Sequence, residues 1–266
     1  MNLLHAIILG FIQGLTEFLP VSSSGHLVFL PKIFGWGDQG LSFDVILHLG
    51  SLTAVVIYFR NKLWKMIKGV VLVKSKKYKV ERKLAWLIVL TIIPAGIIGL
   101  LFNDWIETNL RSSVVIGVGL IFWGMILYFA EKFNQKSEIK NLKSLNWKQA
   151  LFIGCAQAIA LIPGTSRSGI TMTAGLFSKL DKKSVAEFSF LMSVPIILLA
   201  GALNFLDLIK VGLGDLTLGI LLVGFLSAFF SGLVAIAGLM KIIQKWSFKP
   251  FVVYRVVVGI LILLLL

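Results

Sequence analysis

The residues best suited to chemistry lie in LPVSSSGHLVFLP, residues 19–31, between two apolar stretches. Ser23 is the middle one of three consecutive serines. His26 follows it by three residues and Glu17 precedes it by six. A serine hydroxyl becomes a useful nucleophile when a neighbouring base takes its proton. We therefore consider Ser23 as a nucleophile with His26 or Glu17 as its base, and a purely structural serine–histidine pair as the alternative.

A second polar stretch, LIPGTSRSGITM, contains Arg167 in otherwise apolar surroundings. Placing an arginine near the centre of a membrane costs about 2.5–3.5 kcal/mol on insertion scales, so this residue needs a partner or a function. A guanidinium offers paired donors that suit phosphate oxygens. The alternative is a structural salt bridge with Glu17, Asp44 or Glu187.

Both polar stretches end in Ser-Gly and lead into a short apolar segment, at Ser24-Gly25 and at Ser168-Gly169. Serine is a favoured helix N-cap, and the free N–H groups at a helix N-terminus attract anions. Two such ends that face each other would form a phosphate-binding cradle.

Glu17 lies four residues after Gln13, so the two side chains share a face of the same helix. A carboxylate at this place suits a divalent cation, an ion pair with Arg167, or the role of a base. His48 follows Asp44 by four residues, and either a supporting role at the site or a structural hydrogen bond suits it. Arg255 lies near the start of the last apolar stretch and is expected to extend toward the membrane surface.

The composition indicates a membrane protein. Of 266 residues 58% are hydrophobic and 14% are charged, with a mean hydropathy of +0.93, whereas soluble domains contain about 25% charged residues. The net charge of +14 comes from clusters that flank apolar stretches, such as residues 60–83. This placement favours contact with anionic lipids over nucleic acid. The single cysteine, Cys155, excludes an intramolecular disulfide.

We expect one all-α polytopic membrane domain over residues 1–266. Four shorter apolar segments pair into two re-entrant helical hairpins, formed by 3–19 with 25–35 and by 147–162 with 169–178. The six full transmembrane helices are expected at 43–60, 84–103, 113–131, 185–206, 216–240 and 250–266.

The basic residues also predict the orientation. If residues 60–83 are cytoplasmic, the spans put 132–148, 179–184 and 241–249 on the same side, and these segments hold most of the remaining lysines. Residues 104–112 and 207–215 then lie outside. Both termini are expected outside.

A shift of 144 residues relates the two hairpins. It pairs Gly10 with Gly154, Gln13 with Gln157, and the Ser22, Ser24 and Gly25 positions with Ser166, Ser168 and Gly169. An odd number of crossings separates the copies, so they would have opposite orientations. We expect an inverted-topology repeat with halves at about 1–131 and 147–266, and a site where the interrupted helices meet. A chance match is the alternative.

These motifs resemble a known family. QGLTEFLPVSSSGH (13–26) and PGTSRSG (163–169) are similar to the two signature motifs of undecaprenyl-pyrophosphate phosphatases, the bacitracin-resistance family, and FDVILHLG, AEFSFLMSVP and PFVVYR fit its other segments. The resemblance covers nearly the whole chain. It implies an enzyme that removes the terminal phosphate of a polyprenyl diphosphate carrier and recycles the carrier for peptidoglycan synthesis, with a divalent cation, Mg²⁺ or Ca²⁺.

By position, the resemblance assigns the motif acid to Glu17, the nucleophile to Ser23, the histidine to His26 and the essential arginine to Arg167. Gln13 stands where many members have glutamate, which weakens any metal site built on more than Glu17. The hydroxyls that would line the site are those of Ser22, Ser24, Ser166, Ser168 and Thr171.

We expect Ser23 to attack the terminal phosphorus, with His26 favoured as the base; direct attack by water is the alternative. A transporter or flippase of polyprenyl phosphate is the main rival function, because opposed re-entrant hairpins also occur in carriers. The expected partners are the polyprenyl diphosphate and membrane lipids. A homodimer is compatible with the sequence.

Overall fold

The chain folds into helices throughout the part that the structure describes. This computed structural model describes residues 1–37, 39–135, 139–211 and 216–266, with only the backbone at 41, 103, 104, 107 and 203–211. Within these ranges there are eleven α-helices, two single 3₁₀ turns and no strand; Lys140 and Leu180 form an isolated bridge. The expected all-α class is confirmed.

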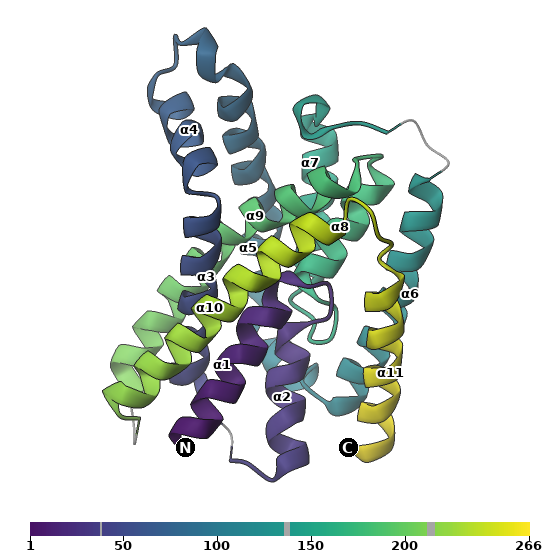
Figure 1. Ribbon diagram of the computed structural model, residues 1–266. Helices are drawn as coiled ribbons and strands as arrows, with labels where there is room; N and C mark the ends of the chain where they lie inside the picture. Colours follow the sequence, from purple (N-terminus) through teal and green to yellow (C-terminus); the bar gives the residue numbers. More distant parts are fainter. Residues whose placement is uncertain (38, 136–138, 212–215) are drawn as a thin grey trace.

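The helices follow one another with short connections (Figure 1). Their bounds are α1 Leu3–Phe18, α2 Ser23–Phe34, α3 Leu41–Tyr58, α4 Arg60–Val71, α5 Lys79–Asn109, α6 Ser113–Asn134, α7 Trp147–Ile159, α8 Arg167–Phe177, α9 Lys182–Val211, α10 Leu218–Ile242 and α11 Lys249–Leu265.

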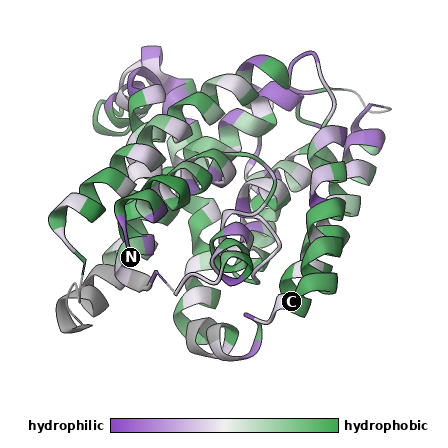
Figure 2. Ribbon diagram, turned by 60° about the horizontal axis from the view of Figure 1, so that its bottom comes forward, coloured by the Kyte–Doolittle hydropathy of each residue, from purple (hydrophilic) through white to green (hydrophobic). Residues whose placement is uncertain are grey.

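Four helices, α5, α6, α9 and α10, contain stretches long and apolar enough to cross a membrane, and the number rises to five if α3 and α4 form one bent span. The expected span 43–60 corresponds to α3, and a bend of 78° separates it from α4. The span expected at 250–266 is the 17-residue α11, which is about 26 Å long against an apolar core of about 30 Å. Hydrophobic residues predominate along the helices (Figure 2). The chain is therefore a multi-pass membrane protein, and its described residues contain four or five of the six long spans expected.

Two helical hairpins, α1–α2 and α7–α8, meet at their tips inside the helical bundle (Figure 1). A hydrogen bond of 2.8 Å from Ser168 Oγ to the carbonyl oxygen of Leu19 joins the tips directly. Ser22 and Ser166, which the 144-residue shift pairs, have the same left-handed φ of 72°. The two polar stretches of the sequence thus have the same local backbone and lie together.

The two ends of the molecule differ in charge. Both termini lie at one end in Figure 1, and the basic helix α4 lies at the other. The α1–α2 hairpin reaches the centre from the end with the termini, whereas the α7–α8 hairpin reaches it from the opposite end. Residues 212–215 of the expected outer segment 207–215, and residues 136–138 of the expected inner segment, lie outside the described residues.

Close backbone contact fixes the position of the first hairpin. Helix α1 packs along α10, and a Cβ built on Gly14 would lie 2.1 Å from both the carbonyl oxygen of Ala228 and Ser231 Oγ. Contacts of this length require the helices to separate. Small residues allow such close approach of membrane helices.

We predict that Gly14→Ala lowers the unfolding temperature of the detergent-solubilised protein, because the added methyl group forces α1 away from α10, at a cost of about 1–3 kcal/mol. The matched control is Gly238→Ala on α10, where the new Cβ has no neighbour within 4 Å, and where alanine's higher helix propensity favours stability. Equal melting temperatures for the two variants would contradict the tight α1–α10 contact.

Candidate active site

At each hairpin tip a helix begins with a serine cap, and the first backbone N–H groups of that helix have no intrahelical partner. Ser22 caps α2 by accepting a hydrogen bond from the backbone N–H of Gly25 (3.4 Å), and Ser166 caps α8 in the same way through Gly169 (3.1 Å). The first N–H groups of a helix have no intrahelical acceptor. The amides at the start of α2 and α8 are therefore oriented for an anion. The caps predicted from the sequence, Ser24 and Ser168 of the Ser-Gly pairs, lie inside the helices and are not the caps.

An ion pair connects the tips. Arg167 at the start of α8 donates from Nη2 to Glu17 Oε1 at 2.8 Å, and from Nη1 to the carbonyl oxygen of Ser189 at 3.0 Å. Glu17 is buried near the end of α1. The structural salt bridge considered from the sequence is thus present with Glu17, while Glu187 pairs instead with Lys62. Two of the five guanidinium N–H groups are used, so donors remain for a ligand.

The other oxygen of Glu17 faces the candidate nucleophile. Ser23 Oγ donates to Glu17 Oε2 at 2.7 Å, and Gln13 Nε2 donates to the same oxygen at 3.1 Å. A hydroxyl bonded to a carboxylate in this way is placed to lose its proton to that carboxylate. The structure therefore brings together Ser23, Glu17 and Arg167, three residues that the sequence selected separately.

His26 lies apart from this group. Its Nδ1 is 2.7 Å from the carbonyl oxygen of Ser22, which can only accept, so Nδ1 carries the proton. In the neutral ring Nε2 then accepts from the hydroxyl of Tyr254 at 2.6 Å. The structure does not bring His26 to the hydroxyl of Ser23, and of the two candidate bases only Glu17 contacts it.

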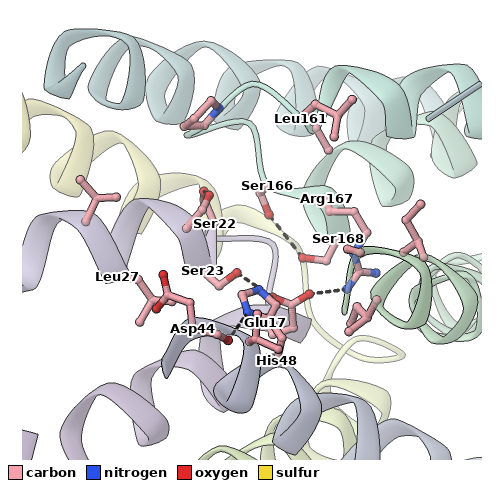
Figure 3. Close-up of a pocket in the computed structure, with 18 of the residues that line it drawn as sticks. Glu17, Ser22, Ser23, Leu27, Asp44, His48, Leu161, Ser166, Arg167 and Ser168 are labelled. Carbon is pink, nitrogen blue, oxygen red and sulfur yellow. Dashed lines mark hydrogen bonds and ion pairs between the residues drawn. The ribbon is translucent and has the colours of Figure 1, made fainter. Parts of the chain in front are cut away.

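The tips open into a pocket of about 350 Å³ (Figure 3). Of the predicted site residues, seven line it: Glu17, Ser22, Ser23, Ser24, Ser166, Arg167 and Ser168. Five lie behind this lining: Gln13, Gly25, His26, Gly169 and Thr171.

Thr171 supports Arg167 from behind. Its hydroxyl is within 2.8 Å of the carbonyl oxygen of Arg167 and 2.7 Å of the hydroxyl of Ser189. Because the carbonyl of Ser189 also accepts from Arg167, Thr171 helps to fix the arginine rather than to contact a ligand directly.

Three charged or titratable side chains that the sequence did not assign to the site also line the pocket: Asp44, His48 and Arg111. His48 Nε2 lies 3.9 Å from Glu17 Oε2, and its Nδ1 contacts the carbonyl oxygen of Asp44 at 2.7 Å. The spacing of Asp44 and His48 suggested a supporting role. Arg111 gave no such signal because it lies far from both motifs in the sequence.

Arg255 differs from expectation. It was expected to extend toward the membrane surface, but it is fully buried and donates to five backbone carbonyl oxygens near the hairpin tips. Burial leaves a guanidinium no water to bind, so it binds carbonyl groups instead.

The pocket offers oxygen ligands, which Mg²⁺ and Ca²⁺ prefer. Among the described residues no group of three or more His, Cys, Asp or Glu side chains is placed to hold a metal. Gln13 Oε1, next to Glu17, is buried without a hydrogen-bond partner. Mg²⁺ commonly binds one or two carboxylates together with substrate phosphates. The residues present fit a cation held in that way, through Glu17 and Asp44, rather than a complete protein cage.

The fold and the pocket define a multi-pass membrane protein with a pocket that contains a hydroxyl–carboxylate–guanidinium group. The chain belongs to the family described as Bacitracin resistance protein BacA, which it matches over residues 6–261.

Curated relatives match over essentially the full length. The chain is 44% identical to Undecaprenyl-diphosphatase 2 of Stutzerimonas stutzeri, with 100% of this chain and 98% of the relative covered. It is 45% identical to Undecaprenyl-diphosphatase of Campylobacter curvus (99% and 98%), and 46% identical to Undecaprenyl-diphosphatase 1 of Pseudoalteromonas translucida (98% and 97%).

We predict that Gln13→Glu makes stability depend on a divalent cation. The change puts a second carboxylate where an amide now donates to Glu17 at 3.1 Å, and two adjacent carboxylates repel unless a proton or a cation lies between them. The melting temperature of this variant should rise more with Mg²⁺ or Ca²⁺ than that of the wild type.

The control is Gln157→Glu. Gln157 is also buried with an unpartnered Oε1, but its Nε2 contacts the carbonyl oxygen of Thr91 instead of a carboxylate. This variant should be destabilised without a comparable response to the cation. An equal response in both variants would remove the Gln13–Glu17 pair as a cation site.

Proposed function

We propose that this protein hydrolyses undecaprenyl diphosphate to undecaprenyl phosphate and inorganic phosphate. The observation that supports this most is the hydrogen-bonded group that crosses the two tips, from Ser23 through Glu17 to Arg167. Phosphoryl transfer needs an oriented nucleophile and neutralisation of the phosphoryl oxygens, and this group supplies both.

In the first step Ser23 Oγ bonds to the terminal phosphorus while the bond from phosphorus to the bridging oxygen breaks. The electron pair of that bond leaves with undecaprenyl phosphate, and the proton of Ser23 passes to Glu17. A protonated Glu17 is neutral and holds Arg167 less strongly. The guanidinium is then available to the phosphoryl oxygens at the moment when their charge needs stabilisation.

In the second step the phosphoserine is hydrolysed. Glu17 first passes its proton to the departing lipid phosphate and then takes a proton from water, whose oxygen bonds to phosphorus as the bond to Ser23 Oγ breaks. Inorganic phosphate leaves, and Glu17 returns to Ser23 Oγ the proton that it took from water. The amides at the start of α2 and α8 bind the phosphoryl oxygens in both steps. A divalent cation held by Glu17, Asp44 and the substrate would add Lewis-acid stabilisation.

The pocket suits an amphiphile. Its polar end is formed by the tips, and Leu27, Val28, Ile116, Ile196 and Ile197 supply an apolar wall. Burial of isoprenoid carbons against such a wall contributes about 0.8 kcal/mol per CH₂ group. A diphosphate on a prenyl chain matches both halves of this lining.

In the cell, this reaction would recycle the lipid carrier for peptidoglycan synthesis and confer bacitracin resistance. We place the protein in the bacterial inner membrane as an inverted-topology repeat with re-entrant hairpins and both termini outside. The basic residues of α4 at the end opposite to the termini support this orientation. Arg111, which lines the pocket, belongs to the expected outer segment, so we infer access from the outer side.

Reconstitution in liposomes tests the function. Purified protein should release labelled phosphate from terminally labelled undecaprenyl diphosphate in proportion to its amount, and Arg167→Ala should release almost none. Translocation of undecaprenyl phosphate is scored separately in the same vesicles. Translocation without phosphate release would favour the transporter and contradict the phosphatase.

We predict that Ser23→Ala lowers turnover at least about 10³-fold, because it removes the attacking oxygen. Rapid quench of the wild type with labelled substrate should trap phosphate on Ser23. Ser24→Ala is the matched neighbour: Ser24 lies in the same pocket but its hydroxyl contacts Ser22 Oγ at 3.4 Å instead of Glu17, so its loss should cost much less. Substantial turnover by Ser23→Ala would leave water as the nucleophile.

A further inference from the structure

Arg255 on α11 is a fully buried cation with no carboxylate beside it in the described part of the chain. Its Nε donates to the carbonyl oxygen of Leu120 at 3.1 Å, and its Nη2 approaches that of Gly119 at 3.4 Å, both on α6. A buried charge is costly unless it is hydrogen-bonded. The arginine is thus anchored to α6 on one side, and its remaining donors point toward the hairpin tips.

These donors bind both tips. Arg255 Nη1 donates to the carbonyl oxygen of Pro20 on the first tip at 3.3 Å, and Nη2 donates to those of Gly164 and Thr165 on the second tip at 3.1 and 2.9 Å. All three carbonyls lie just before a helix starts. One guanidinium therefore fixes the distance between the segment that leads to Ser23 and the segment that leads to Arg167.

Tyr254, the residue before Arg255, makes a second contact between α11 and the first tip. Its hydroxyl binds His26 Nε2 at 2.6 Å, and the two rings are stacked with centroids 5.6 Å apart. His26 Nδ1 then binds the carbonyl oxygen of Ser22, the left-handed residue directly before Ser23. A non-glycine residue with this positive φ is strained and persists only when its surroundings hold it.

Two glycines, Gly124 and Gly169, lie against the side chain of Arg255 and leave room for it. A Cβ built on Gly169 would lie 2.7 Å from Arg255 Nη1, and one on Gly124 would lie 3.3 Å from Arg255 Cβ. A Cβ built on Gly25, the matching glycine of the first motif, would lie no closer than 3.4 Å to any neighbour, and the nearest atoms belong to Ile116 and Ser22. The glycine of the second motif is thus required by the guanidinium behind the tip.

We propose that Tyr254 and Arg255 form a positioning pair on α11 that sets the spacing and orientation of Ser23 relative to Arg167. On this reading His26 acts through the backbone of Ser22 and is a positioning residue too. The kinetic part of the proposal rests on the proposed phosphatase function. A misplacement of about 1 Å between reacting groups lowers turnover by about 10²-fold, because the bound substrate no longer meets the nucleophile in line.

The variants are Arg255→Lys and Tyr254→Phe, with Glu131→Gln as the matched control. Glu131 is also buried and also anchors α11, but at its first residues: it accepts from the backbone N–H of Phe248 at 2.9 Å and pairs with Lys182. Loss of Glu131 should lower the melting temperature and leave the turnover of the folded enzyme unchanged.

Arg255→Lys should lower kcat of the folded enzyme by about 10²-fold with a much smaller change in KM, because an ammonium cannot reach carbonyls on both tips and α6 at once. Tyr254→Phe keeps the ring stack and should lower kcat by about 2- to 13-fold, the effect of one lost hydrogen bond of about 0.5–1.5 kcal/mol. A kcat unchanged in both variants, or lowered equally by Glu131→Gln, would overturn the proposal.

A distance measurement removes the dependence on activity. Spin labels on the native Cys155 of α7 and on Ile33→Cys of α2, both exposed, report the spacing of the two hairpins by pulsed electron paramagnetic resonance. Arg255→Lys should broaden or shift the distance distribution, and Glu131→Gln should not. If the wild type releases no phosphate, the proposed function fails, while this measurement still decides the positioning role. If Arg255→Lys does not fold, Tyr254→Phe decides it, through kcat and the same labels.

Discussion

A helix that stops inside an apolar protein leaves backbone N–H and C=O groups without partners, and in a membrane no water replaces them. This constraint applies at both hairpin tips of this protein. The structure meets it by pairing the C=O groups with protein donors and leaving the first N–H groups facing the pocket. The carbonyl oxygens bind protein donors: Leu19 accepts from Ser168, Ser22 from His26, and Pro20, Gly164 and Thr165 from Arg255. The amides at the helix starts are left for the pocket. The interruption of the helices therefore costs backbone hydrogen bonds, and it also provides the N–H groups of the candidate anion site.

The ion pair between Glu17 and Arg167 makes the two tips one site. Replacing one partner of a buried pair usually costs 3–5 kcal/mol, because the other charge is left unpaired. The same pair keeps the guanidinium of Arg167 beside Ser23, with the carboxylate of Glu17 as its counter-ion. In the proposed reaction, proton transfer from Ser23 to Glu17 and release of Arg167 toward the phosphate would be one coupled event, since Ser23 and Arg167 bind the same carboxylate.

The side chains that meet in the pocket were largely predictable from the sequence, whereas their supports were not. Glu17 and Arg167 could be selected because an acid and an arginine are rare in apolar segments, and Ser23 because it lies within a few residues of Glu17 and His26. The role of Arg255 could not, because its partners are backbone carbonyls, which every residue has. The contacts of His26 were not predictable either, because its partners, Tyr254 and the Ser22 carbonyl, are set by tertiary packing. The bend between α3 and α4, which follows no proline, also gave no signal.

The 144-residue shift relates the tips in backbone but not in chemistry. It sets Arg167 opposite Ser23, Leu161 opposite Glu17 and Ile170 opposite His26. One tip thus supplies the nucleophile and its base, and the other supplies the positive charge. Two equivalent tips would suit a carrier that alternates between two states related by a pseudo-twofold axis. Two tips with the same fold but complementary side chains suit a reaction, in which a nucleophile and a charge must approach one phosphorus from different sides.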